Sequence, residues 1–160
     1  MRFAAFALAL AAVPAFALAA DSPPAAHPEA KPFGSPDSAR GEVELALTTA
    51  IATDTRVILV FGANWCHDSR ALAGWFATPR FATMLRDRYE IVWINVGDNP
   101  GEKDRNGDLA RRFGLGAIKG TPTVLILNSK GKPRNLRGAP KWRNAASRSG
   151  DAIYDYFAKQ

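Results

Sequence analysis

The sequence is poor in the residues that cross-link a fold or bind metal ions. Its 160 residues contain one cysteine, Cys66, and two histidines, so no disulfide can form within the chain. No cluster of metal ligands surrounds His27 in the sequence, and we predict that its side chain is solvated. We therefore expect neither a metal site nor a bound cofactor.

The N-terminal residues are apolar and suggest export. Residues 1–20 carry a single positive charge, and small residues at 17–19 have the spacing of a cleavage site. We predict a signal peptide over residues 1–20, cleaved near Ala19 or Ala20, and a periplasmic protein that meets the membrane only through this segment. An uncleaved anchor is the alternative, but the run is alanine-rich, interrupted by Pro14 and barely long enough to span a bilayer.

Removal of this segment leaves a chain of single-domain length. Residues 21–37 are rich in proline and poor in apolar side chains, so we predict an extended, poorly ordered linker without chemistry of its own. One domain then covers residues 38–160. The prolines of the linker are Pro23, Pro24, Pro28, Pro32 and Pro36.

The surroundings of the lone cysteine favour a reactive thiol. Val57–Phe61 is short, apolar and rich in β-branched residues, which predicts a strand buried on both faces. Leu72, Trp75 and Phe76 recur at helical spacing, so Cys66 should lie at the start of a helix, where free N–H groups stabilise a thiolate. Faster alkylation than that of a model thiol is expected; an inert, buried cysteine is the alternative.

Other apolar patterns predict the rest of the domain. The alternation of strand and helix indicates a parallel crossover unit. The predicted elements are a helix with Val43, Leu47, Ala50 and Ile51 on its face that begins after Asp37 or Ser38, a helix with Phe81, Met84 and Leu85 after a break at Thr78-Pro79, a strand over 91–96, a short helix between 106 and 113, an edge strand over 133–137 and a closing helix with Ile153, Tyr156 and Phe157.

The charges are distributed unevenly along the chain. Residues 109–150 contain ten basic residues and no acidic one, whereas residues 21–108 contain thirteen acidic and nine basic residues. Export argues against a nucleic-acid partner, so we expect an acidic envelope surface or an acidic substrate. The alternative is a solvated basic face that only aids solubility.

Two motifs resemble the thioredoxin superfamily. Trp65-Cys66-x-x-Ser69 is similar to the Trp-Cys-x-x-Cys motif that this family carries between a strand and a helix, and Gly120-Thr-Pro-Thr-Val-Leu-Ile-Leu127 resembles its cis-proline and central strand. The resemblance runs from about Val43 to the end of the chain. It implies an α/β, thioredoxin-like fold: a central mixed sheet with helices on both faces and a cis-proline, Pro122, before a central strand.

The sequence departs from the family pattern at two positions. Ser69 stands where the resolving cysteine is expected, and Val60 stands where dithiol members carry a buried acidic residue. In dithiol members that carboxylate helps to deprotonate the resolving cysteine. Both departures affect the release of a mixed disulfide, and the chain therefore resembles a monothiol variant.

The candidate catalytic residues are Cys66, His67 and Ser69. A protonated His67 would favour the thiolate, Asp68 would disfavour it, and a Ser69 hydroxyl turned towards the sulfur would donate a hydrogen bond to it. The alternative gives Asp68 and Ser69 a role only at the helix N-terminus and leaves His67 exposed.

The resemblance also implies three substrate-binding residues. Trp65 should shield the sulfur, Pro122 should approach Cys66, and the backbone of Thr121 should pair with an extended substrate segment. Threonine before the proline resembles the periplasmic disulfide isomerase and sulfenic-acid reductase branch.

The function implied is exchange through a mixed disulfide. Cys66 would react with protein disulfides or oxidised thiols, and an external thiol, glutathione among the candidates, would resolve the product. The protein is expected to be a monomer and to act in deglutathionylation or isomerisation. The alternative is a redox-inactive binding module that docks an envelope partner through the basic segment 109–150.

Overall fold

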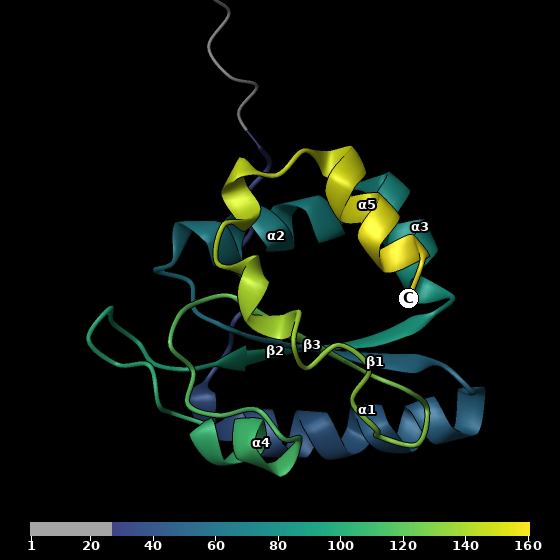
Figure 1. The fold of residues 1–160 in the computed structure, drawn as a ribbon, viewed down its shortest axis with the longest axis horizontal. Coiled ribbons are helices and arrows are strands. Elements are labelled where there is room, and N and C mark those ends of the chain that lie inside the picture. Colours follow the sequence, from purple (N-terminus) through teal and green to yellow (C-terminus); the bar gives the residue numbers. More distant parts are fainter. Residues whose placement is uncertain (1–26) are drawn as a thin grey trace, which may run out of the picture.

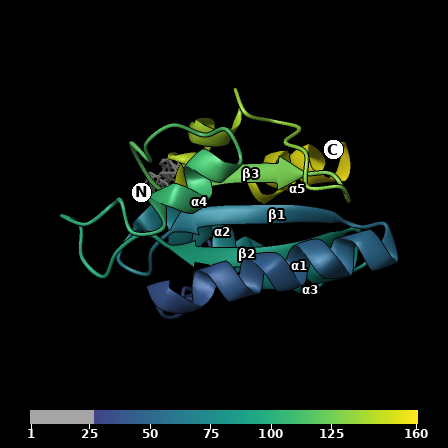
Figure 2. The same cartoon turned by 90° about the horizontal axis from the view of Figure 1, so that it is seen from below.

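A mixed three-stranded sheet lies at the centre of the domain. The computed structural model describes residues 27–160. In this part of the chain, β1 (Arg56–Gly62) lies between β2 (Tyr89–Asn95), to which it is parallel, and β3 (Thr123–Leu127), to which it is antiparallel (Figure 2). The predicted central mixed sheet is confirmed.

Helices cover both faces of the sheet, as predicted (Figure 1). One face carries α1 (Ala39–Thr53) and α4 (Gly107–Arg112), and the opposite face carries α2 (His67–Ala77), α3 (Pro79–Arg86) and α5 (Gly150–Ala158). Three short 3-10 helices complete the described elements: η1 (Pro36–Ser38), η2 (Ala139–Trp142) and η3 (Ala145–Ser147).

The middle strand explains the continuous apolar run of the sequence. Successive side chains of a strand point to opposite faces of its sheet. Val57, Leu59 and Phe61 enter the core beneath α1, and Ile58 and Val60 enter the core beneath α2. All five side chains are buried, so a polar residue without a hydrogen-bond partner at any of these five positions would lower the stability of the fold.

The crossover from β1 to β2 contains two helices. The break between them lies at Thr78, which is extended, and Pro79 opens α3 because proline is tolerated at the first helical position. The short helix α4 ends before Gly114, whose positive φ of 80° suits a residue without a Cβ. Among residues 27–160, no helix combines the length and the apolar character needed to cross a membrane.

Two details of the predicted elements are wrong. Ile51 is 68% exposed, because Val43, Ala46 and Ala50 already form the buried stripe of α1 and residue 51 is rotated away from it. Residues 133–137 form no strand; Pro133 makes a single bridge with Leu127.

A side chain takes the place of the predicted edge strand. The side chain of Asn135 accepts a hydrogen bond from the N–H of Ile126 (2.8 Å) and donates one to the carbonyl of Val124 (3.0 Å). These backbone groups of β3 would otherwise pair with a neighbouring strand. The amide of Asn135 therefore satisfies two backbone groups at the edge of β3 that a strand was expected to cover, and the N–H of Arg134 satisfies the carbonyl of Ile126.

The proline-rich segment is packed where the structure describes it, contrary to the prediction of a poorly ordered linker. The signal peptide predicted over 1–20, and residues 21–26, lie outside the described residues. Residues 27–35, called the strap below, have no regular secondary structure, but Phe33 is only 4% exposed and packs edge-on against Trp93. Burial of this aromatic ring anchors the segment to the core beneath α2.

The strap lies against α2. The N–H of Ala30 donates a hydrogen bond to the carbonyl of Arg70 (3.1 Å). A Cβ on Gly74 would lie 2.1 Å from the carbonyl oxygen of Pro28, so the strap can approach α2 this closely only because residue 74 is glycine.

Candidate functional site

Cys66 lies where the sequence places it, at the start of α2. It occupies the N-cap position, with an extended backbone, and its carbonyl accepts the hydrogen bond of the Arg70 N–H at 3.0 Å. Its thiol is free and its side chain is partly exposed. A thiol that solvent can reach therefore lies at the helix N-terminus, although its side chain makes no capping hydrogen bond to the N–H groups of the first turn.

The sheet topology brings a second loop to this thiol. Because β3 runs antiparallel to β1, its first residue, Thr123, pairs with Phe61 near the end of β1. The residues just before β3 thus lie beside the loop that carries Cys66. The Thr121–Pro122 peptide bond is cis, and the thiol of Cys66 donates a hydrogen bond to the carbonyl of Thr121 at 3.4 Å.

Trp65 is held by its indole N–H. This group donates a hydrogen bond to the carbonyl of Gly97, just beyond β2, at 2.9 Å. The ring is therefore fixed between the loop after β1 and the loop after β2, next to Cys66 in the chain. A tethered indole has less rotational freedom than a free surface tryptophan.

Ser69 does not make the predicted hydrogen bond to the sulfur. Its side chain is fully buried, and its Oγ has no hydrogen-bond partner among residues 27–160. The hydroxyl lies over β1: a Cβ on Gly62 would be 2.6 Å from it. Residue 69 therefore points into the core beneath α2, and a buried hydroxyl without a partner costs stability.

Asp68 has a structural partner. Its carboxylate accepts a hydrogen bond from the N–H of Ala146 in η3 at 2.8 Å. This contact fastens the start of α2 to the C-terminal part of the chain. It favours the structural role that the sequence left open for Asp68.

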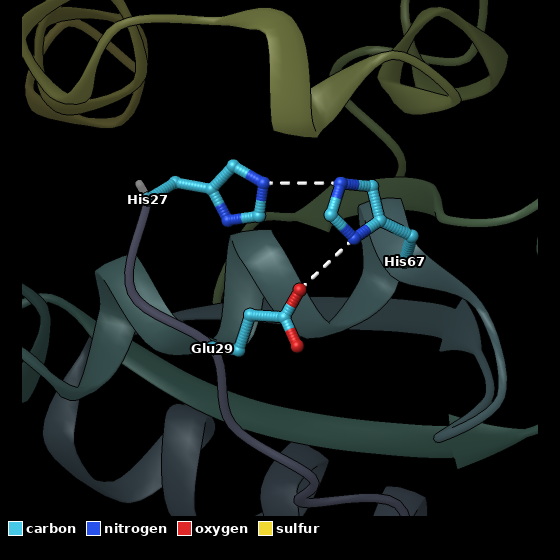
Figure 3. Close-up of side chains that lie close together, drawn as sticks. All are labelled: His27, Glu29 and His67. Atoms are coloured by element: carbon cyan, nitrogen blue, oxygen red, sulfur yellow. Dashed lines mark hydrogen bonds and ion pairs between the residues drawn. The ribbon is translucent and has the colours of Figure 1, made fainter. Parts of the chain in front are cut away.

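His67 faces the strap. Its Nδ1 lies 2.9 Å from the carboxylate of Glu29, and its Nε2 lies 3.1 Å from Nε2 of His27 (Figure 3). Within the described part of the chain its ring makes no hydrogen bond to Cys66. The prediction of a solvated His27 without potential ligands nearby is wrong, because the packed strap carries His27 to a residue forty positions away.

Glu29 is held from a second side. Nε of Arg70 donates a hydrogen bond to its other carboxylate oxygen at 2.9 Å. This bond, with a smaller contribution from His67, keeps the pKa of the Glu29 carboxyl below its usual range. Arg70 also donates to the carbonyls of Asn64 (3.2 Å) and Trp65 (3.0 Å), so one guanidinium connects the strap to the loop that carries Cys66.

Three side chains form a possible metal-binding group. One ligand atom from each of His27, Glu29 and His67 lies within 4.8 Å of the other two. Sequence analysis missed this group because Glu29 and His27 lie in a segment without periodicity. Apart from the fact that the chain has only two histidines, no feature of the sequence connects His27 with His67.

A pocket of about 300 Å³ adjoins the loop before Pro122. Two of its lining residues, Lys119 and Arg143, are basic and belong to the segment 109–150. Part of the basic segment 109–150 therefore lies near Thr121. It is lined by Leu115, Gly116, Ala117, Ile118, Lys119, Gly120, Thr123, Pro140 and Arg143.

Comparisons with known proteins agree with this geometry. A family model described as thioredoxin-like matches residues 39–129. A thiol:disulfide interchange protein of Synechococcus elongatus is 28% identical over 109 residues, which are 66% of this chain and 50% of that protein, so the chain spans about half the length of this relative. The crystal structure of a disulphide isomerase from Xylella fastidiosa is similar with a TM-score of 0.71 and 35% identity, over 81% of this chain and 96% of that one.

Proposed function

Since the chain belongs to the thioredoxin-like family, we propose that it exchanges thiols and disulfides through the single thiol of Cys66. The observation that supports this most directly is the position of Cys66: partly exposed at the start of α2, with its sulfur 3.4 Å from the carbonyl of Thr121. The names of the two relatives, a thiol:disulfide interchange protein and a disulphide isomerase, indicate functions of the same class.

The exchange has two steps. The Cys66 thiolate attacks one sulfur of a partner's disulfide; a new S–S bond forms, the old one breaks, and the second sulfur leaves as a thiolate that takes up a proton. An external thiol then attacks the mixed disulfide, forms a disulfide with the partner's sulfur and releases Cys66 as a thiolate. The resolving thiol must come from another molecule because the chain has no second cysteine, and we propose glutathione for this role.

Thr121 has a role in both the resting and the reacting state. In the resting state its carbonyl accepts the thiol proton of Cys66. A thiolate has no proton to donate, so deprotonation frees this carbonyl to accept a hydrogen bond from the backbone N–H of an extended substrate segment. Trp65 and Pro122 are the proposed walls of that substrate site.

The basic pocket supports substrates that carry carboxylates. Lys119 and Arg143 line it beside the loop of Thr121, where the carboxylates of glutathione or of an acidic peptide can be paired. Protein disulfides with such neighbours, and glutathionylated protein thiols, are the proposed substrates. Periplasmic location through the signal peptide over residues 1–20, and a monomeric state, are part of this proposal.

One observation favours a second function, a redox-inactive binding module. Among the described residues, neither His67 nor Ser69 makes a hydrogen bond to the sulfur, although both are candidates to activate it. In that case the basic segment 109–150 would dock an envelope partner and Cys66 would be incidental. Complementation in cells by Cys66→Ala separates the two: retained function favours the binding module.

The direct test is adduct formation. Wild-type protein incubated with oxidised glutathione should gain the mass of one glutathione, and Cys66→Ala should gain none. Intact-mass measurement reads both, and labelling by a small alkylating reagent controls for access to the thiol. Alkylation without adduct formation contradicts the exchange function.

A gain-of-function variant tests the monothiol step. Ser69→Cys introduces an internal resolving thiol one helical turn from Cys66, so its glutathione adduct should be short-lived and its reduction of insulin disulfides faster than that of the wild type. An adduct as stable as that of the wild type shows that a thiol at position 69 cannot reach the Cys66 sulfur.

A further inference from the structure

The chain's two histidines meet at one point. The Nε2 atoms of His27 and His67 are 3.1 Å apart, and the ring centroids are 4.6 Å apart at an interplanar angle of 55°, so the rings are tilted and face each other through their nitrogens (Figure 3). Two neutral imidazoles can share one proton in this arrangement. They can also share a cation.

The separation fits a shared metal ion. Two imidazole nitrogens bound at about 2.0–2.1 Å to one tetrahedral ion lie roughly 3.4 Å apart, and a right-angled pair lies about 2.9 Å apart. The observed 3.1 Å between the two Nε2 atoms falls between these values. The His67 side chain is 59% exposed, so a small rotation of its ring can aim its own Nε2 lone pair at an ion bound by Nε2 of His27.

A carboxylate fixes the ligating form of His67. Oε1 of Glu29 lies 2.9 Å from Nδ1 of His67, and a proton on Nδ1 leaves the lone pair on Nε2, the atom that faces His27. A metal-bound histidine almost always donates its other N–H to a carboxylate or carbonyl in this way. Arg70 holds the second oxygen of Glu29, which keeps the carboxylate in place.

From this arrangement we propose that His27 and His67 bind one divalent transition-metal ion through their Nε2 atoms, with Glu29 as the carboxylate that orients His67. Imidazole ligands suit zinc, copper and nickel better than magnesium or calcium. The Glu29 and His67 side chains are 38% and 59% exposed, so the ion can enter from solvent and water can complete its coordination.

Binding joins two parts of the chain. His27 and Glu29 belong to the strap, and His67 is the first residue of α2. An ion held between them fastens the strap to the helix that begins at Cys66. The thiol is not a ligand in this proposal, which therefore stands or falls separately from the proposed exchange function.

The test is a metal titration of protein that carries no polyhistidine tag. Zinc chloride and copper(II) chloride are titrated separately by calorimetry at neutral pH, and one ion per chain is expected for at least one of them. His27→Ala and His67→Ala should each weaken binding by at least about tenfold, and Glu29→Gln by about 10–100-fold. Cys66→Ala should bind as the wild type does.

A matched control is available for the carboxylate. Glu44 is also a partly exposed glutamate paired with an arginine, Arg112, but no histidine lies beside it. Glu44→Gln removes the same charge elsewhere, so it should leave the metal affinity unchanged. Equal weakening by Glu44→Gln and Glu29→Gln would reduce the effect to net charge and overturn the site.

A structural readout follows the strap itself. The N–H of Ala30, bonded to the carbonyl of Arg70, should exchange with solvent more slowly when the metal is present, in the wild type but not in His67→Ala. Because the His67 ring is largely exposed, this variant decides the question even if His27→Ala disturbs the strap. No binding by the wild type, unchanged affinity in His67→Ala, or loss of binding in Cys66→Ala each overturns the proposal.

Discussion

The first turn of α2 has two sides built in different ways. On the cysteine side, the Cys66 thiol contacts a backbone atom, the carbonyl of Thr121. On the histidine side, His67 contacts two side chains of the strap, Glu29 and His27. A backbone contact is fixed by the sheet topology and survives most substitutions, whereas side-chain contacts can be removed one at a time. The two sides can therefore be separated by mutation.

Two polar residues connect the sides. Arg70 reaches the strap through Glu29 and the cysteine loop through the carbonyls of Asn64 and Trp65. The side chain of Asn64 pairs with both the N–H and the carbonyl of Phe33. Thus the strap is attached to the backbone that immediately precedes Cys66.

The largest effect should come from Phe33→Ala, which removes the apolar anchor of the histidine side. Loss of a buried phenylalanine costs about 3–5 kcal/mol, a large part of the stability of a small domain. Urea denaturation should show this loss, and Leu45→Ala, which truncates a side chain that is 69% exposed, should change stability by less than about 0.5 kcal/mol. Equal costs for both variants would mean that the strap is not part of the core.

Phe33→Ala also sharpens the comparison at Cys66. The contact with Thr121 depends on β1 and β3, so the folded variant should still form the glutathione adduct. The rate of adduct formation is measured at urea concentrations below the unfolding midpoint of the variant. A rate lower than that of the wild type would show that the cysteine side depends on the strap.

A smaller effect is expected from Asn64→Asp, which breaks the connection between the sides. The carboxylate still accepts from the Phe33 N–H but cannot donate to the Phe33 carbonyl, now 2.7 Å from the amide nitrogen. The loss of a partly buried hydrogen bond, with two oxygens left facing each other, should cost about 1–3 kcal/mol. Amide exchange at Ala30 should become faster, because the strap loses a contact with the loop that carries Cys66. The rate of adduct formation at Cys66 should also differ from that of the wild type, because Asn64 belongs to the same loop.

Sequence reasoning succeeded where local pattern and topology decide the structure. The apolar run of β1, the break at Pro79 and the placement of Cys66 all follow from residues within one or two elements. It failed where a single side chain acts across the fold. Phe33 anchors a segment whose composition indicates disorder, and Asn135 replaces a strand, and neither role leaves a periodic signal.

Ser69 shows the same limit within the motif itself. Its position three residues after Cys66 suggested a hydroxyl near the sulfur, but the hydroxyl lies over β1 beside Gly62. Ser69→Ala should therefore raise the free energy of unfolding slightly, by about 1 kcal/mol, because it removes a buried hydroxyl that has no partner among residues 27–160. Thermal melts measure this gain. Slower formation of the glutathione adduct in Ser69→Ala would instead show that Ser69 contributes to the reaction of Cys66.

The smallest effect concerns a region far from both sides. Arg112 lowers the pKa of Glu44 and Arg40 lowers that of Asp108, and both ion pairs join α1 to α4. A carboxyl with a lowered pKa in the folded state stabilises the fold above its ordinary value, 4.5 for glutamate and 3.8 for aspartate, and this contribution is lost as the pH falls through the folded-state pKa.

Exposed ion pairs contribute little to stability, so their effect should be visible only as a difference between the wild type and a variant that lacks them. The double variant Glu44→Gln/Asp108→Asn should lose less thermal stability than the wild type when the pH falls from about 5 to about 3. Parallel Tm curves for the two proteins would show that the pairs are not formed in solution. Adduct formation at Cys66, measured at neutral pH, should be the same in both.

The contact between Cys66 and Thr121 has a consequence for the order in which the site is made. The two residues are 55 positions apart, and the ribosome adds Cys66 first. Until β3 has been synthesised and has docked beside β1, the nascent thiol has no carbonyl partner. With one cysteine in the chain, it cannot be trapped in a wrong internal disulfide during this interval. The disulfide that the newly made chain can form is one with another molecule, and this is the same event that the finished protein would use as its reaction.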